Sequence, residues 1–149
     1  MEDPVELLKE LIRINTTNPP GAEAALLDCL ERKLAKAQLP FARQETAPGR
    51  GNLVSRLKAD GEITLPPLVL LSHTDVVAAD PSQWLHPPFE AYEDEKGFIY
   101  GRGAVDTKQL TAMELCAYEA LAKTPGRCRD VYFLDTCDEE SGSTYGLQA

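Results

Sequence analysis

Three short stretches of the sequence carry side chains that could bind divalent metal ions and activate water. His73 and Asp75 stand two positions apart, Asp106 follows a glycine-rich turn, and Glu139 and Glu140 are adjacent. Imidazole and carboxylate groups are the usual ligands of catalytic zinc. A second, unbound carboxylate could accept and return a proton. This set would therefore support metal-assisted hydrolysis.

The spacing of each stretch has a mechanical interpretation. Residues two positions apart in extended backbone point the same way, so Asp75 could hold one nitrogen of His73 while the other nitrogen binds metal. Asp106 could bridge two cations with its two carboxylate oxygens. One carboxylate of Glu139 and Glu140 could bind metal while the other stays free to take a proton from water.

Each stretch alone also fits an ordinary structural role. A His-x-Asp pair can be a satisfied surface histidine, and adjacent acidic residues can form a solvated face. The Gly101-Arg102-Gly103 turn could suggest a phosphate loop, but neither dinucleotide-binding nor P-loop spacing follows it. For Arg102 we expect a structural salt bridge rather than substrate binding.

The predicted secondary structure places these stretches at one edge of a sheet. We expect helices over 3–14, 22–37 and 108–123 and strands over 52–58, 68–71 and 131–134. The continuous apolar runs of the last two strands are typical of strands buried on both faces. Helices interleaved with such strands predict an α/β sandwich with a mostly parallel sheet. Ligands bind beyond the carboxyl ends of strands in such sheets, which is where the candidate residues stand.

Bulk properties exclude several classes of protein. The 149 residues suit one domain. A formal net charge of −9 argues against a general nucleic-acid binder and fits either gathered metal ligands or an ordinary acidic surface. The sequence has no apolar run near the ~20 residues that cross a bilayer and no signal core at its N-terminus, so we expect a cytoplasmic protein. The four irregularly spaced cysteines predict reduced thiols.

Four motifs in order resemble a known family. They are His73-Thr74-Asp75-Val76-Val77, Trp84 with Pro88-Phe89, Gly101-Arg102-Gly103-Ala104-Val105-Asp106-Thr107-Lys108, and Asp138-Glu139-Glu140-Ser141-Gly142, and the N-terminal Thr17-Asn18-Pro19-Pro20-Gly21 adds to them. The chain is similar over essentially its whole length to the cocatalytic zinc metallopeptidase family of aminoacylases, glutamate carboxypeptidases (carboxypeptidase G type) and succinyl-diaminopimelate desuccinylases.

The resemblance implies a three-layer αβα sandwich with a mostly parallel mixed sheet, of the zinc exopeptidase type. It implies two divalent metal ions, zinc in the first place, with cobalt or manganese as alternatives. His73 would bind one ion, Glu140 the other, and Asp106 both. Glu139 would be the general base, and Asp75 would orient His73. A cis peptide bond is implied after the bridging aspartate.

These implications predict a hydrolase of amide or peptide bonds that uses a two-metal-activated water. Peptides, N-acyl amino acids and succinylated amines are the candidate substrates, with no nucleic-acid or membrane partner. Two alternatives stay open: a non-catalytic binding or scaffold domain that retains the fold, and an unrelated nucleotide-binding α/β protein.

The resemblance also predicts that residues 1–149 are the N-terminal part of the catalytic domain. Relatives carry a further acidic ligand, a late histidine and an inserted dimerisation domain, so the full-length form could be a homodimer. We expect the chain alone to bind zinc weakly and to hydrolyse slowly or not at all. His86, the only other histidine, stands in a proline-rich stretch that we interpret as a structural loop.

Overall fold

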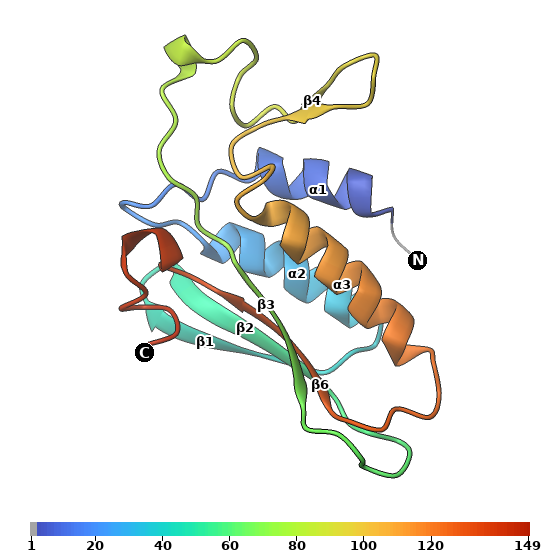
Figure 1. Cartoon of the computed structure of the whole chain (residues 1–149). Coiled ribbons are helices and arrows are strands. Elements are labelled where there is room, and N and C mark those ends of the chain that lie inside the picture. The colour runs from blue at the N-terminus through green and yellow to red at the C-terminus, as the bar shows by residue number, and fades with distance from the viewer. Residues whose placement is uncertain (1–2) are drawn as a thin grey trace.

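The computed structural model describes residues 3–149, in which helices cover one face of a four-stranded sheet (Figure 1). The predicted helices are confirmed as α1 (Pro4–Arg13), α2 (Ala24–Lys36) and α3 (Lys108–Ala122). The sheet contains β1 (Phe41–Ala47), β2 (Arg50–Leu57), β3 (Leu68–His73) and β6 (Val131–Thr136). The long segment between β3 and α3 contains a small hairpin, which is formed by β4 (Tyr92–Glu93) and β5 (Ile99–Tyr100).

Local sequence explains where the first helix begins. The carboxylate of Asp3 accepts a hydrogen bond from the Val5 amide at 2.9 Å, and Pro4 occupies the first helical position. An aspartate cap satisfies an amide that has no partner inside the helix, and proline at this position has no amide to satisfy. The helix ends before the Asn15–Gly21 segment, as the prolines of that segment predict.

The α/β class is confirmed, but the expected mostly parallel sheet is wrong for the described strands. Their order is β1-β2-β6-β3, and only the β3–β6 pairing is parallel. The β1–β2 connection is a tight turn, which can join only antiparallel strands. Between β3 and β6 the chain is long enough to include α3 and to return in the same direction. The carboxyl ends of β3 and β6 therefore lie together.

The hydrophobic core lies between the helices and one face of the sheet. Leu53 and Phe133 are fully buried in one cluster that also contains side chains of all three helices. On the other face, Val69 and Leu71 of β3 are 49% and 43% exposed. The predicted burial of this strand on both faces is therefore wrong. No described helix covers its outer face, so the third layer of the predicted sandwich is not formed by residues 3–149.

None of the four cysteines forms a disulfide within residues 3–149, and three of them are buried. None of the described helices combines the length and apolarity that a membrane span requires.

One carboxylate on β6 lies inside the core. Asp135 is fully buried, and neither of its oxygens has a hydrogen-bond partner among residues 3–149. The hydroxyl of nearby Thr111 donates to Ser72 at 3.1 Å instead. Burial raises the pKa of Asp135 to about 7, and the negative charge of Glu114 acts in the same direction. Because the folded pKa exceeds the unfolded one, ionisation of Asp135 destabilises the fold as the pH rises from about 4 to about 7.

We expect Asp135→Asn to stabilise the chain by roughly 4 kcal/mol at about pH 8. A pKa that rises from about 4 in the unfolded chain to about 7 in the folded chain costs roughly 4 kcal/mol once the carboxyl is ionised, and the neutral amide avoids this cost. At about pH 4 the carboxyl is largely protonated, so the two proteins should have nearly equal stabilities. Urea unfolding at both pH values measures this difference. A variant that is equally stabilised at both pH values would contradict the assigned role of ionisation.

Candidate metal centre

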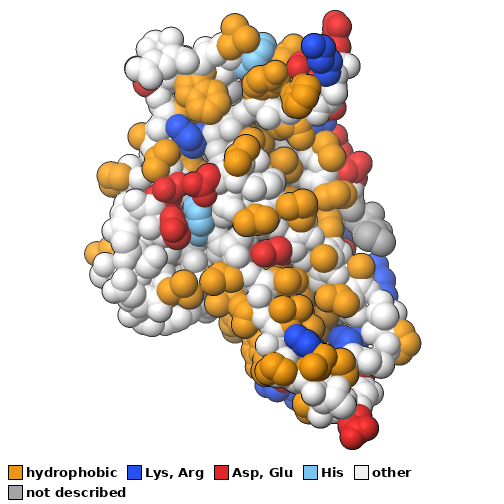
Figure 2. All heavy atoms as spheres, in the orientation of Figure 1, with side chains coloured by type: hydrophobic (Ala, Val, Ile, Leu, Met, Phe, Trp, Pro, Cys, Tyr) orange, Lys and Arg blue, Asp and Glu red, His pale blue; other side chains and the backbone are white. Residues whose placement is uncertain are grey.

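Three side chains from distant parts of the sequence meet at the carboxyl ends of β3 and β6. His73, Asp106 and Glu140 each offer a ligand atom, and these atoms all lie within 4.8 Å of one another. His73 is the last residue of β3, Glu140 follows β6, and Asp106 precedes α3. Figure 2 shows acidic side chains gathered around a histidine on this face of the molecule.

His73 is nearly buried, and both of its ring nitrogens face oxygen atoms. Nδ1 lies 3.0 Å from the backbone oxygen of Asp75 and 3.5 Å from its carboxylate. Nε2 lies 3.0 Å from the Asp106 carboxylate and 3.8 Å from that of Glu139. Burial lowers the pKa of His73, but the hydrogen bonds and charges of Asp75 and Asp106 outweigh it and raise this pKa to about 9. Without metal, the ring is therefore protonated at neutral pH.

Asp75 organises more of the site than the sequence pattern predicts. Its fully buried carboxylate accepts hydrogen bonds from the backbone amides of Glu139 at 3.1 Å and Glu140 at 3.2 Å, and from the side chain of Asn18 at 2.8 Å. Burial opposes ionisation, but the hydrogen bonds from His73 and Asn18 lower the pKa of Asp75 below its usual value. An ionised Asp75 therefore contacts both the histidine and the backbone of the glutamate pair.

Asn18 connects Asp75 to a buried network of charged side chains. Asn18 also donates to Asp138 at 3.0 Å, and Asp138 accepts from Arg50 at 3.0 Å. The Arg50 guanidinium donates to Glu23, which is fully buried, at 2.6 Å. A side chain at Gly21, where φ is +86°, would collide with this guanidinium. Sequence reasoning missed these supporting roles. Only the motif around Asn18 pointed to this region, and no signal marked Arg50 or Glu23.

Replacing Asn18 by alanine should weaken zinc binding about 10- to 100-fold, the usual loss when a group that orients metal ligands is removed. The change leaves Asp75 and Asp138 without the amide that joins them. Calorimetric titration with zinc measures the effect. Asn15→Ala is the matched control, because Asn15 is exposed and bonds only to Thr17 among the described residues. An equal loss in both variants would count against the positioning role.

Two carboxylates of the site remain open to solvent. The side chains of Asp106 and Glu139 are 72% and 55% exposed. Burial raises the pKa of Glu140, and the negative charge of Asp106 adds to that rise. This is the mutual repulsion expected of carboxylates gathered without cations. An imidazole and carboxylates with accessible oxygens match the ligand preferences of zinc, so the residues fit a divalent ion.

The other candidate residues lie outside this cluster. Arg102 does not form the expected salt bridge within residues 3–149; its guanidinium lies over the ring of Trp84 instead. His86 stacks on Tyr92 with ring centroids 3.6 Å apart, in keeping with a structural loop. The peptide bond between Asp106 and Thr107 is cis, as predicted.

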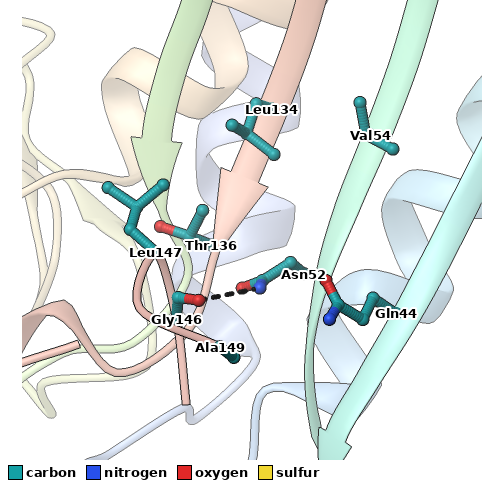
Figure 3. Close-up of a pocket in the computed structure, with 8 residues that line it drawn as sticks. All are labelled: Gln44, Asn52, Val54, Leu134, Thr136, Gly146, Leu147 and Ala149. Carbon is teal, nitrogen blue, oxygen red and sulfur yellow. Dashed lines mark hydrogen bonds between the residues drawn. The ribbon is translucent and has the colours of Figure 1, made fainter. Parts of the chain in front are cut away.

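A separate hollow lies where the C-terminal segment meets the sheet (Figure 3). It is lined by uncharged side chains, namely Gln44, Asn52, Val54, Leu134, Thr136, Gly146, Leu147 and Ala149. Asn52 donates to the Gly146 oxygen at 3.1 Å and accepts from the Cys137 amide at 3.1 Å. The contact with Gly146 attaches the segment after Glu140 to β2, and the side chains that line the hollow supply no metal ligand.

Comparison with known proteins decides the family. The model of peptidase family M20/M25/M40 matches residues 69–149, which include the three converging side chains. The chain belongs to the M20 peptidase family. This M20 chain is 35% identical to aminoacylase-1 of Sus scrofa over 147 residues, or 97% of the chain and 35% of that relative. It is 34% identical to aminoacylase-1 of Homo sapiens over 146 residues, with the same coverage.

Solved structures establish the zinc exopeptidase-like fold of the M20 chain. An M20 family metallo-carboxypeptidase, Sso-CP2 from Sulfolobus solfataricus, superposes with a TM-score of 0.81 at 24% identity, covering 96% of this chain and 32% of that one. Human carnosine dipeptidase 1 superposes with a TM-score of 0.75 at 23% identity, covering 95% and 33%. The M20 chain thus spans about a third of the length of these relatives.

Proposed function

We propose that this M20 chain contributes to a metal-dependent hydrolase of amide or peptide bonds. The observation that carries the proposal is the convergence of His73, Asp106 and Glu140 beside the exposed carboxylate of Glu139. Relatives described as aminoacylases, a carboxypeptidase and a dipeptidase support an amide bond as the target. The cytoplasm is the proposed location.

Each residue has a proposed task. His73 and Glu140 would each hold one of two divalent ions, Asp106 would contribute to holding both, and zinc is the proposed metal. Bound ions would polarise the amide carbonyl and make a water molecule more acidic. Glu139 takes a proton from the attacking water and returns it to the leaving amine. Its exposed side chain is free to reach both, and Asp75 holds its backbone amide.

Zinc binding tests the proposal through the protonation of His73. A folded-state pKa near 9, above the ordinary value of 6.5, means that the ring holds a proton up to that pH. Zinc requires the neutral ring, so binding should release about one proton at pH 7 and strengthen about tenfold per unit between about pH 6 and pH 8. Calorimetry in two buffers of different ionisation enthalpy counts the released protons. Zinc binding without proton release would contradict the assignment of His73.

A catalytic test requires amide substrates of several kinds. We expect the isolated chain to hydrolyse N-acetyl amino acids and dipeptides slowly or not at all. A longer form of the protein should hydrolyse them. The Glu139→Gln variant of that longer form should lose this activity. Zinc binding without hydrolysis by the longer form would favour the alternative of a binding domain that retains the fold.

A further inference from the structure

Two buried hydroxyl groups form a chain of hydrogen bonds between α3 and β3. The Thr111 hydroxyl of α3 donates to the Ser72 hydroxyl of β3 at 3.1 Å, and Ser72 donates to the Glu114 carboxylate at 3.0 Å. Thr111 is fully buried and Ser72 is 5% exposed, so solvent does not replace these contacts. The two bonds attach α3 to the end of β3, against which the helix packs (Figure 1).

Asp135 faces the same space from β6. It is the direct partner of Ser72 in the parallel pairing of β3 and β6, and both side chains are buried. Burial raises the pKa of Asp135, and the nearby Thr111 hydroxyl opposes this rise. The carboxyl group of Asp135 therefore lies at the end of the chain that begins with Thr111.

The number of hydroxyl protons limits what this chain can satisfy. Glu114 is only partly buried, which favours its ionised form, and a carboxylate can only accept. The single proton of Ser72 is used for Glu114, and the single proton of Thr111 is used for Ser72. No hydroxyl proton remains for Asp135, whose two oxygens have no hydrogen-bond partner among residues 3–149. The Thr111 oxygen can still accept a hydrogen bond.

We propose that Asp135 binds a proton in the folded chain, donates it to the Thr111 hydroxyl, and thereby completes a pH-sensitive lock between α3, β3 and β6. Three protons then serve three hydrogen bonds. When Asp135 loses its proton to solvent, two protons remain for three bonds. Thr111 turns to the ionised carboxylate, and its bond to Ser72 is lost. Because Ser72 precedes His73 and α3 follows Asp106, the lock joins the two elements beside the candidate metal centre.

The pH at which the lock opens depends on burial and on the surrounding charges. Burial is the main reason that the pKa of Asp135 lies at about 7. Glu114 of α3 and Asp75, which follows β3, raise this pKa, whereas His73 lowers it. Lys108 of α3, whose own pKa is lowered by burial, is attracted to Asp135. The position of β2 that pairs with Asp135 carries an apolar side chain. The lock is therefore closed in mild acid and opens as the pH rises through neutrality.

NMR of labelled aspartate carboxyl carbons measures the proton on Asp135 directly. The chain is titrated in zinc-free buffer, and the Asp135 signal is the one that the Asp135→Asn variant lacks. This signal should titrate with a midpoint of about 7. The backbone amide signals of Ser72 and Thr111 should change with the same midpoint. Titration of Asp135 near the ordinary value of about 4, or amide signals that do not follow it, would overturn the proposal.

Ser72→Ala separates the lock from a merely buried acid. Without the Ser72 hydroxyl, a proton on Asp135 no longer secures the bond between α3 and β3. The midpoint of Asp135 should therefore fall by about 0.5–1 pH unit, the equivalent of one hydrogen bond between neutral groups.

Ser55→Ala is the matched control. Ser55 is a buried serine of β2 that bonds to Pro40 and Tyr118 and has no bond to the lock in the described part of the chain. Its loss should leave the midpoint unchanged. Circular dichroism checks that both variants are folded. A folded Ser72→Ala variant with an unchanged midpoint, or an equal fall in both variants, would overturn the lock.

Discussion

Arg50→Met should lower the free energy of unfolding by about 3–5 kcal/mol, the usual cost of removing one partner from a buried ion pair. The change removes the only guanidinium that bonds to Glu23 and Asp138 in the described part of the chain. Glu23 is fully buried and Asp138 nearly so, and methionine leaves both carboxylates without a cation. Urea unfolding at neutral pH measures the loss.

Arg43→Met is the matched control for this experiment. Arg43 pairs with Asp28 at 2.6 Å, but the carboxylate of Asp28 is largely exposed. Exposed pairs of this kind contribute roughly 0–1 kcal/mol. A similar loss of stability in both variants would mean that burial does not determine the effect, and a loss below about 1 kcal/mol in Arg50→Met would contradict the network described above.

Zinc affinity should fall more than about 100-fold in His73→Ala, since loss of a direct ligand should exceed the 10- to 100-fold cost of losing a group that only orients one. The change removes the one nitrogen ligand of the cluster and leaves two carboxylates. Direct calorimetric titration, or competition with a chelator of known affinity, gives the ratio of dissociation constants.

The second histidine provides the control. His86 stacks on Tyr92 and belongs to no metal-binding group among the described residues. His86→Ala should bind zinc as tightly as the unsubstituted chain. Retained affinity in His73→Ala would show that zinc binds elsewhere and would contradict the proposed centre.

The sequence predicts the candidate centre well because its residues follow regular elements. His73 follows a continuous apolar run, and Glu139 and Glu140 follow another, so the parallel pairing of β3 and β6 brings them together. That pairing requires a long connection, which the predicted helix over 108–123 supplies. The family resemblance added the cis peptide bond at Asp106, which no local pattern predicts.

The supporting network could not be predicted in the same way. Asn18 lies 57 and 120 residues from its two carboxylate partners, and Arg50 lies 27 from Glu23. Such contacts depend on how loops pack in three dimensions and leave no periodic pattern. Residue type also misleads a prediction of burial here. Arg and Glu are usually exposed, whereas Arg50 and Glu23 are buried.

Errors in the predicted fold have similar physical causes. β1 was not predicted, because its sequence is mostly polar and its side chains are largely exposed. On α3, the apolar side chains of Leu110 and Met113 are 39% and 51% exposed, while Tyr118 is fully buried. Hydropathy alone cannot distinguish a side chain that faces the core from an apolar one on an uncovered surface.

The hydrogen bonds of Asp75 also determine how the centre would respond to thermal motion. One carboxylate from the end of β3 holds the amides of Glu139 and Glu140, which follow β6. If the two strands slide slightly against each other, the imidazole and both glutamates are displaced as one unit. We expect the spacing between the proton acceptor and these ligands to change little as the sheet fluctuates, and the distance to Asp106, which lies before α3 and outside both strands, to vary more.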